Sequence, residues 1–292
     1  MPDMQYFEPE SLQEVFYLLE RYEDEARLMA GGTGLINLMK QRLVQPGYLI
    51  GLRRLSKDMA GVQRENGGLK IGALTTHWDV EHSPVVKEVA PLLAENYHRV
   101  ATVRIRNIAT VGGGLAHADP NMDPPQAYIV LDAKVRCTSR AGTREIPIEQ
   151  FFKDYYETAL GPGEVVSEVI VPSQPARSSY AYLKFLPRTA DDYATVSVAA
   201  RVTMAEDGQT CQDARIALGS VGSTPVRATA AENALKGQRL TPEALRAAAA
   251  TVPPVVDPIS DFRGSAEYKR DMSAVFTRRA LEQALSRAQG RQ

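Results

Sequence analysis

Two short glycine-rich stretches constrain this chain more than any other feature of its sequence. Residues 31–34 read Gly-Gly-Thr-Gly, and residues 112–114 are three consecutive glycines. Glycine has no Cβ atom, so it adopts positive φ angles easily and lets another group approach the backbone closely. We therefore expect a second group to lie against the main chain at both places.

The first stretch falls between a strand-like run at residues 26–30 and a helical pattern at residues 35–43. Backbone amides at such a turn, together with the positive end of the helix dipole, favour a bound phosphate. The stretch is neither the GxGxxG of a dinucleotide fold nor a P-loop with its lysine. Many strand-to-helix turns use glycine for steric reasons alone, so both interpretations stay open at this point.

The second stretch, residues 110–114, reads as another turn of the same kind, and the two together predict a dinucleotide whose diphosphate is held from two sides. His117, Asp119, Asn121 and Asp123 follow, with side chains able to reach ribityl or ribose hydroxyls. Both aspartates precede proline, however, as residues that cap a turn often do. We favour capping for Asp119 and cofactor binding for Asp123.

The pattern of apolar residues predicts an α+β fold in two parts. In the first part we expect helices at 10–22, 35–43, 75–81 and 85–97, strands at 26–30, 48–52 and 164–171, and hairpins at 61–72 and 134–146. In the second part we expect strands at 180–186, 194–204 and 211–221 and helices at 229–236, 241–251 and 265–288. Residues 173–179 have the composition of a linker. The expected domains are 1–175, with subdomains of about 1–55 and 56–175, and 176–292.

Composition excludes several classes of function. A formal net charge of -1 and 44% hydrophobic residues describe an ordinary soluble protein without a nucleic-acid partner. The apolar runs are too short for a membrane span, and the N-terminus lacks the pattern of a secretory signal, so we expect a cytoplasmic location. Cys137 and Cys211 are the 2 cysteines, and neither they nor the 4 histidines have metal-binding spacing. We expect no metal here, so any redox centre is organic or lies on another chain.

The combination of motifs resembles a known family. Residues 30–35, residues 110–120 and the Asp-Pro-Pro at 123–125 are similar to the FAD-binding medium subunits of the xanthine oxidase family of molybdenum hydroxylases, of which the carbon monoxide dehydrogenase type is nearest. Residues 151–160, 163–166, 184–185 and 192–194 follow in the order found in that family. The resemblance covers essentially the whole chain.

The resemblance implies a PCMH-type FAD-binding domain of two subdomains, followed by a smaller C-terminal α+β domain with an antiparallel sheet. It places the diphosphate between residues 31–35 and residues 110–114, and the ribityl or adenosine hydroxyls at Asp123. Lys184 would approach the polar edge of the flavin, where its charge would favour the reduced form, and Tyr193 would lie beside the ring. The implied cofactor-binding residues are Ala30, Gly31, Gly32, Thr33, Gly34, Leu35, Thr110, Val111, Gly112, Gly113, Gly114, His117, Asp123, Val166, Lys184 and Tyr193. Gly114 stands where the family often has Asn.

The implied function is to carry electrons. The family passes them from [2Fe-2S] clusters of a small subunit through FAD to an external acceptor, while a large subunit with a molybdopterin cofactor hydroxylates the substrate, commonly in a dimer of heterotrimers. This chain then has no catalytic acid or base, and its lack of a second nucleotide motif favours an acceptor other than NAD. The alternatives are a self-contained PCMH-type flavoprotein oxidase, or a scaffold protein whose glycine turns, like Lys184 on the surface of a strand, are only structural. The substrate stays open.

Overall fold

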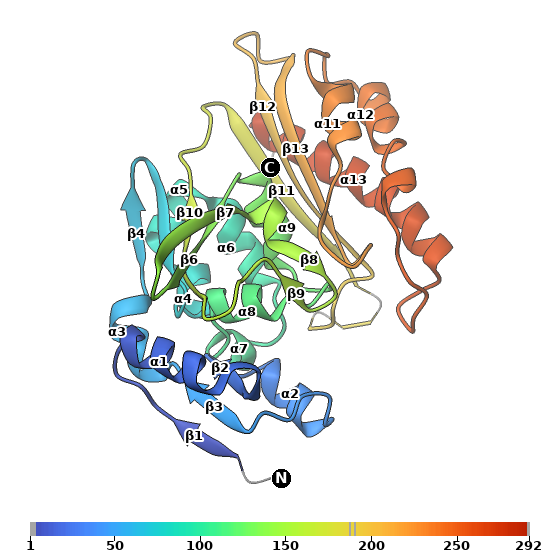
Figure 1. Cartoon of the computed structure of the whole chain (residues 1–292). Coiled ribbons are helices and arrows are strands. Elements are labelled where there is room, and N and C mark those ends of the chain that lie inside the picture. The colour runs from blue at the N-terminus through green and yellow to red at the C-terminus, as the bar shows by residue number, and fades with distance from the viewer. Residues whose placement is uncertain (1–3, 187, 190, 291–292) are drawn as a thin grey trace.

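The computed structural model describes residues 4–186, 188–189 and 191–290, so the first three residues of the N-terminal stretch discussed above lie outside it. Three main sheets follow one another along the molecule, and Figure 1 shows the N-terminal sheet at one end and the C-terminal sheet at the other. The α+β fold with an antiparallel C-terminal sheet is confirmed.

The N-terminal sheet is parallel, with strand order β1-β3-β2. It comprises β1 (Gln5–Phe7), α1 (Leu12–Tyr22), β2 (Ala26–Met29), α2 (Leu35–Lys40) and β3 (Tyr48–Gly51), with short helical turns at Glu23–Glu25 and Arg53–Leu55. The side chain of Ser11 caps α1 by accepting a hydrogen bond from the backbone N–H of Glu14. The pattern did not predict β1, because its three residues are too few to show a period.

The central sheet has five strands in the order β4-β5-β10-β6-β7, and all of its pairs are antiparallel. The strands are β4 (Val62–Glu65), β5 (Gly68–Gly72), β6 (Lys134–Ser139), β7 (Gly142–Pro147) and β10 (Val165–Val171). The helices are α3 (Ser56–Met59), α4 (His77–His82), α5 (Pro84–Val89), α6 (Pro91–His98), α7 (Val103–Arg106), α8 (Val111–His117), α9 (Pro124–Val130) and α10 (Ile148–Phe151). A small hairpin of β8 (Phe152–Asp154) and β9 (Glu157–Thr158) follows α10. Both predicted hairpins are confirmed.

Two predictions in this region were wrong. The single helix expected at 85–97 is two helices, because Pro91 has no N–H to continue the first and disfavours a helical conformation at Ala90, which has φ -142° and ψ 66°. The glycines at 112–114 do not form a loop but belong to the first turns of α8, which Thr110 caps through its side chain.

The C-terminal sheet is covered on both faces, which explains why its central strand is buried along its whole length. It comprises β11 (Ser178–Phe185), β12 (Val196–Met204), β13 (Cys211–Gly219) and β14 (Val226–Arg227), followed by α11 (Thr229–Leu235), α12 (Pro242–Ala249), a turn at Pro253–Val255 and α13 (Ala266–Ala288). α9 packs on one side of β12 and β13, while α13 packs against β11 and β12 on the other. Every residue of β12 is buried as a result. Among the described residues, no helix combines the length and apolarity that crossing a membrane requires.

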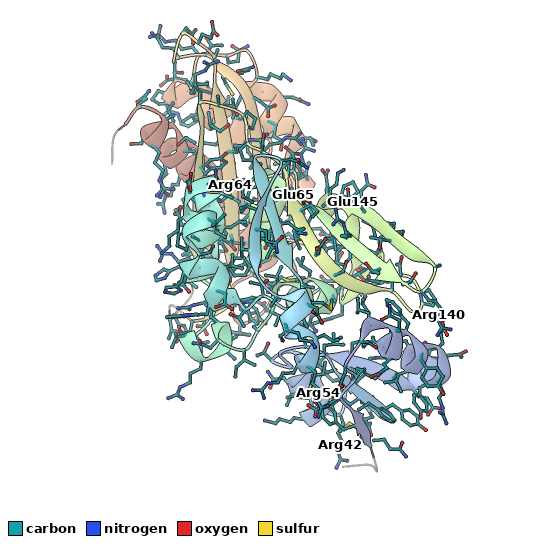
Figure 2. All side chains as sticks on the ribbon, turned by 90° about the vertical axis from the view of Figure 1, so that its left-hand side faces the viewer. Arg42, Arg54, Arg64, Glu65, Arg140 and Glu145 are labelled. Carbon is teal, nitrogen blue, oxygen red and sulfur yellow. The ribbon has the colours of Figure 1, made fainter. Side chains whose placement is uncertain are left out.

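The N-terminal sheet also contacts the central sheet through a hairpin tip. In Figure 2 Arg140, at the turn between β6 and β7, lies above α1. Its Nη1 atom is 2.8 Å from Oε2 of Glu20 on α1. Both side chains are largely exposed, so the pair contributes about 1 kcal/mol or less to stability.

Candidate functional site

The two glycine stretches meet in the structure, although about 80 positions separate them in the sequence. A Cβ atom placed on Gly31 would lie 2.0 Å from the carbonyl oxygen of Ile108, immediately before the second stretch. A Cβ atom on Gly34 would lie 2.5 Å from Nε2 of His117 at the end of α8. Neither position has room for a side chain, so Gly31 packs against the backbone of the second segment and Gly34 packs against the imidazole of His117.

The amides of the two stretches are used differently. In the described part of the chain, none of the N–H groups of residues 31–35 donates to a backbone carbonyl. By contrast, the N–H groups of residues 111, 112 and 114 bond to the carbonyls of Thr75, Ala73 and Thr110 at 2.9, 2.7 and 2.9 Å, and that of Gly113 bonds to Oγ1 of Thr110 at 3.2 Å. Among residues 31–35 and 111–114, the N–H groups without a backbone or side-chain acceptor therefore all lie on the first stretch, which we call the amide cradle (residues 31–35). The second stretch supplies a wall without side chains.

The wall consists of glycines because the central sheet lies directly behind it and leaves little space for side chains. A Cβ atom on Gly112 would be 2.5 Å from Cβ of Ala73, and Ala73 is fixed by its N–H bond to Ser167 of β10 at 2.9 Å. A Cβ atom on Gly113 would be 3.2 Å from Cβ of Ala30, just before the amide cradle. Helix α8 is therefore held between the sheet and the cradle.

A second cluster joins the central sheet's helices to the C-terminal sheet. Asp123 and Lys184 have side chains only 3% and 2% exposed, and their Oδ2 and Nζ atoms are 2.8 Å apart. The Tyr182 hydroxyl donates to the other oxygen of Asp123, and Nζ of Lys184 also donates to the carbonyl of Arg99 at 2.9 Å. Burial raises the pKa of Asp123, while Lys184 and then Tyr182 act to lower it. Lys184 is therefore not a surface lysine.

The structure separates the roles of the two aspartates that precede proline. Oδ1 of Asp119 accepts the backbone N–H of Asn121 at 2.9 Å, which confirms the local capping role that we favoured. Asp123 makes no side-chain capping bond, although it stands at the N-terminus of α9. Its oxygens are instead bonded to Lys184 and Tyr182, so Asp123 fixes the position of the lysine's ammonium group.

Tyr193 lies near both of these aspartates, Asp119 and Asp123. Burial first and then the Asp119 carboxylate raise the pKa of its hydroxyl. The charge of Asp123 acts on it as well. Val166, by contrast, lies in β10 with its side chain in the core. Val111, another predicted site residue, belongs to the same core.

Two side chains of this region were missed by sequence reasoning. Tyr182 lies in β11 and could have been suspected from its place two residues before Lys184, since alternate residues of a strand share a face. Tyr156, whose hydroxyl bonds to Oδ2 of Asp119 at 3.5 Å, has no signal in the sequence. Its backbone φ of 56° would normally be marked by glycine or asparagine.

His77 lies behind the wall and is 5% exposed. Its Nε2 atom is 3.2 Å from the carbonyl oxygen of Thr110, its ring packs edge-on against Tyr97, and its Nδ1 atom has no partner among the described residues. Gly114 leaves room here, because a Cβ atom there would be 3.6 Å from Nε2 of His77. Burial lowers the pKa of His77 from 6.5 to about 4.

This pKa predicts a loss of stability in mild acid. Between about pH 6.5 and 4 the unfolded chain binds a proton at His77 that the folded chain does not. The free energy of unfolding therefore decreases by about 3 kcal/mol as the pH is lowered over that range. A His77→Gln variant should lack this part of the slope, whereas a variant of the exposed His82, His82→Gln, should keep it. Urea unfolding at pH 7, 5.5 and 4.5 measures the difference, and equal slopes in the two variants would contradict it.

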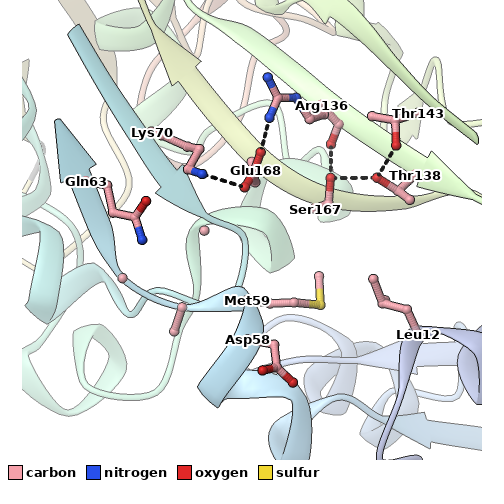
Figure 3. Close-up of a pocket in the computed structure, with 13 residues that line it drawn as sticks. Leu12, Asp58, Met59, Gln63, Lys70, Arg136, Thr138, Thr143, Ser167 and Glu168 are labelled. Carbon is pink, nitrogen blue, oxygen red and sulfur yellow. Dashed lines mark hydrogen bonds and ion pairs between the residues drawn. The ribbon is translucent and has the colours of Figure 1, made fainter. Parts of the chain in front are cut away.

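A separate pocket of about 430 Å³ lies between one face of the central sheet and residues of α1 and α3 (Figure 3). One wall carries Glu168, which bonds to Arg136 and lies 3.6 Å from Lys70, and the opposite wall carries Leu12 and Met59. Asp58 also lines the pocket, so the two acidic and two basic side chains of the pocket balance in charge. The pocket therefore offers no excess charge for an anionic cofactor.

The residues of the cradle fit the diphosphate of a dinucleotide, because free amides and a wall without side chains are what such a group requires. Two family models match the chain: the FAD binding domain in molybdopterin dehydrogenase over residues 2–174, and the CO dehydrogenase flavoprotein C-terminal domain over residues 181–284. Together they describe an FAD-binding oxidoreductase subunit. The chain belongs to the family of FAD-binding medium subunits of molybdenum hydroxylases.

Individual relatives agree over the whole length. The carbon monoxide dehydrogenase medium chain of Hydrogenophaga pseudoflava is 36% identical over 286 residues, which is 98% of each chain. The solved structure of carbon monoxide dehydrogenase from the same organism has a TM-score of 0.94 at 37% identity, covering 98% of both chains. Quinoline 2-oxidoreductase from Pseudomonas putida 86 has a TM-score of 0.92 at 34% identity, again over 98% of both. These relatives support the interpretation of this chain as one subunit of a larger enzyme, and they do not support the alternative of a self-contained oxidase.

Proposed function

We propose that this chain binds FAD with its diphosphate on the amide cradle and passes electrons from iron-sulfur clusters of a small partner subunit to an external acceptor. The observation that carries the proposal is the set of free amides at residues 31–35, held against a wall that has no side chains. Charge-assisted hydrogen bonds from such amides are about twice as strong as neutral ones. Bound FAD would supply the redox chemistry, and the protein its placement and electrostatics.

The remaining predicted residues take their proposed roles from this placement. Asp123 and Tyr182 hold the ammonium group of Lys184 in place, so that a fixed positive charge stands near the cofactor. Tyr193, which is 43% exposed, offers a planar ring to the cofactor. The cofactor-binding set that we propose is residues 30–35 and 110–114 with His117, Asp123, Val166, Lys184 and Tyr193.

The proposed complex contains a large molybdopterin-binding subunit, a small [2Fe-2S] subunit and this chain, as a dimer of heterotrimers in the cytoplasm. Both cysteines of this chain are buried and unpaired, and the described residues contain no group of side chains that could hold a metal ion. We further propose a domain boundary at residue 175, between β10 and β11. The pocket for the hydroxylated substrate would lie on the large subunit, so we propose no substrate.

The test of this function is cofactor binding by the purified chain. We expect a yellow protein with flavin absorbance and FAD uptake that calorimetry registers at about one site per chain. A colourless protein that takes up no FAD would refute the proposal and favour the scaffold interpretation. Purification from the native source should then yield two partners, one of them rich in cysteine and the other two to three times the length of this chain, beyond the size of a single domain.

A further inference from the structure

Tyr156 has a backbone that tyrosine rarely adopts. It lies in the turn between β8 and β9 with φ 56°, in the left-handed region where residues with a Cβ atom are strained. Asparagine or glycine would occupy this position without that strain. Strain of this kind persists where the surroundings hold it in place, and it gathers at functional sites.

Two bonds hold Tyr156 to the turn that follows α8. Its backbone N–H donates to the carbonyl of Ala118 at 3.1 Å, and its hydroxyl bonds to Oδ2 of Asp119 at 3.5 Å. Ala118 is itself left-handed, with φ 52°. Tyr156 nevertheless remains 51% exposed. The backbone and the hydroxyl of Tyr156 are thus both fixed, so the position of its ring is fixed as well.

The contact of the Tyr156 ring is with His117. The two ring centroids are 5.3 Å apart, with planes inclined at 58°. On its other side the imidazole faces Gly34, where Nε2, Cδ2 and Cε1 would lie 2.5, 2.6 and 2.9 Å from a Cβ atom. A continuous row of contacts therefore runs from Asp119 through Tyr156 and His117 to the amide cradle.

We propose that Tyr156 is a positioning residue for the FAD site, which acts by holding the imidazole of His117 against Gly34 at the edge of the amide cradle. The proposal rests on the proposed function, since the ligand of the cradle is FAD. Without the Tyr156 ring the imidazole is free to turn out of its place, and the backbone of Gly34 loses the group packed behind it. Tyr156 then matters for affinity and not for folding.

The variant that separates these effects is Tyr156→Asn in the full chain. Asparagine tolerates the left-handed backbone, so we expect the melting temperature of the FAD-free protein to stay the same or rise. The dissociation constant for FAD, measured by calorimetry, should rise about ten-fold, a coupling usual for residues in contact. The neighbouring Tyr155→Asn is the matched control, because Tyr155 is similarly exposed but bonds through its backbone to Asp154. It should leave FAD affinity unchanged.

A double-variant cycle tests whether Tyr156 acts through His117. His117→Ala should weaken FAD binding to a similar degree, and adding Tyr156→Asn to it should cause no further loss. Additive losses, or a Tyr156→Asn protein that binds FAD as the unchanged chain does, would overturn the proposal. A fall in melting temperature without a change in affinity would also overturn it. If the unchanged chain takes up no FAD, the proposed function itself fails, which is a different result from a loss confined to the variants.

Discussion

A Gly31→Ala variant is expected to bind FAD about 100-fold more weakly than the unchanged chain. The new Cβ atom would lie 2.0 Å from the oxygen and 2.8 Å from the carbon of the Ile108 carbonyl, and these backbone atoms cannot rotate away. The amide cradle must therefore move off the wall. Losing about two charge-assisted hydrogen bonds costs about 3 kcal/mol, which corresponds to the 100-fold change. Calorimetric titration with FAD measures it.

The same substitution at Gly114, the last residue of the wall, is the control for folding. At Gly114 a Cβ atom would make only an ordinary contact, 3.6 Å from Nε2 of His77. Gly114 also lies within α8, where alanine is favoured over glycine by about 1 kcal/mol. Gly114→Ala should therefore fold at least as well as the unchanged chain. If Gly31→Ala keeps full FAD affinity, the cradle does not hold the cofactor in the way proposed.

A Lys184→Met variant is expected to lose about 3–5 kcal/mol of folding stability, because it leaves the buried Asp123 carboxylate without its cation. Removing Lys184 also removes the largest influence that lowers the pKa of Asp123, so this pKa rises further above its unfolded value. The folded state then binds more protons than the unfolded state. The loss should therefore be larger at pH 8 than at pH 5, as urea unfolding at both pH values can show.

Two further variants decide whether the loss comes from an unpaired buried charge. Lys134→Met breaks the pair with Glu145, in which the lysine side chain is 52% exposed, and should cost about 1 kcal/mol or less. The double variant Asp123→Asn with Lys184→Met removes both charges and should recover part of the stability lost in Lys184→Met. Equal losses in Lys184→Met and Lys134→Met would contradict the burial of the pair.

Local patterns predicted much of the secondary structure correctly. The hairpin at β4 and β5 follows from Asn66 and Gly67, which adopt the positive φ angles of 49° and 77° that a tight turn requires. The amphipathic helix α1 and the long helix α13 were found from their apolar spacing. The expectation failed at Pro91, where one proline outweighed the continuous apolar pattern around it.

The sequence also located the two glycine stretches and, through the family motifs, the class of cofactor. It did not distinguish the stretch that donates hydrogen bonds from the stretch that is a wall. That difference depends on the carbonyls of Thr75 and Ala73, which accept the amides of residues 111 and 112 from another part of the chain. A run of glycines has the same sequence whether its backbone amides are free or already hydrogen-bonded.

What the sequence determined alone is the set of elements and the positions where no side chain fits, because both follow from residues close together in the chain. Tertiary structure alone decided the pairing of Asp123 with Lys184, 61 positions apart, and the strained backbone that holds Tyr156 beside His117. The charge of Lys184 is buried only because the C-terminal sheet is packed against α9, and no local pattern encodes that packing.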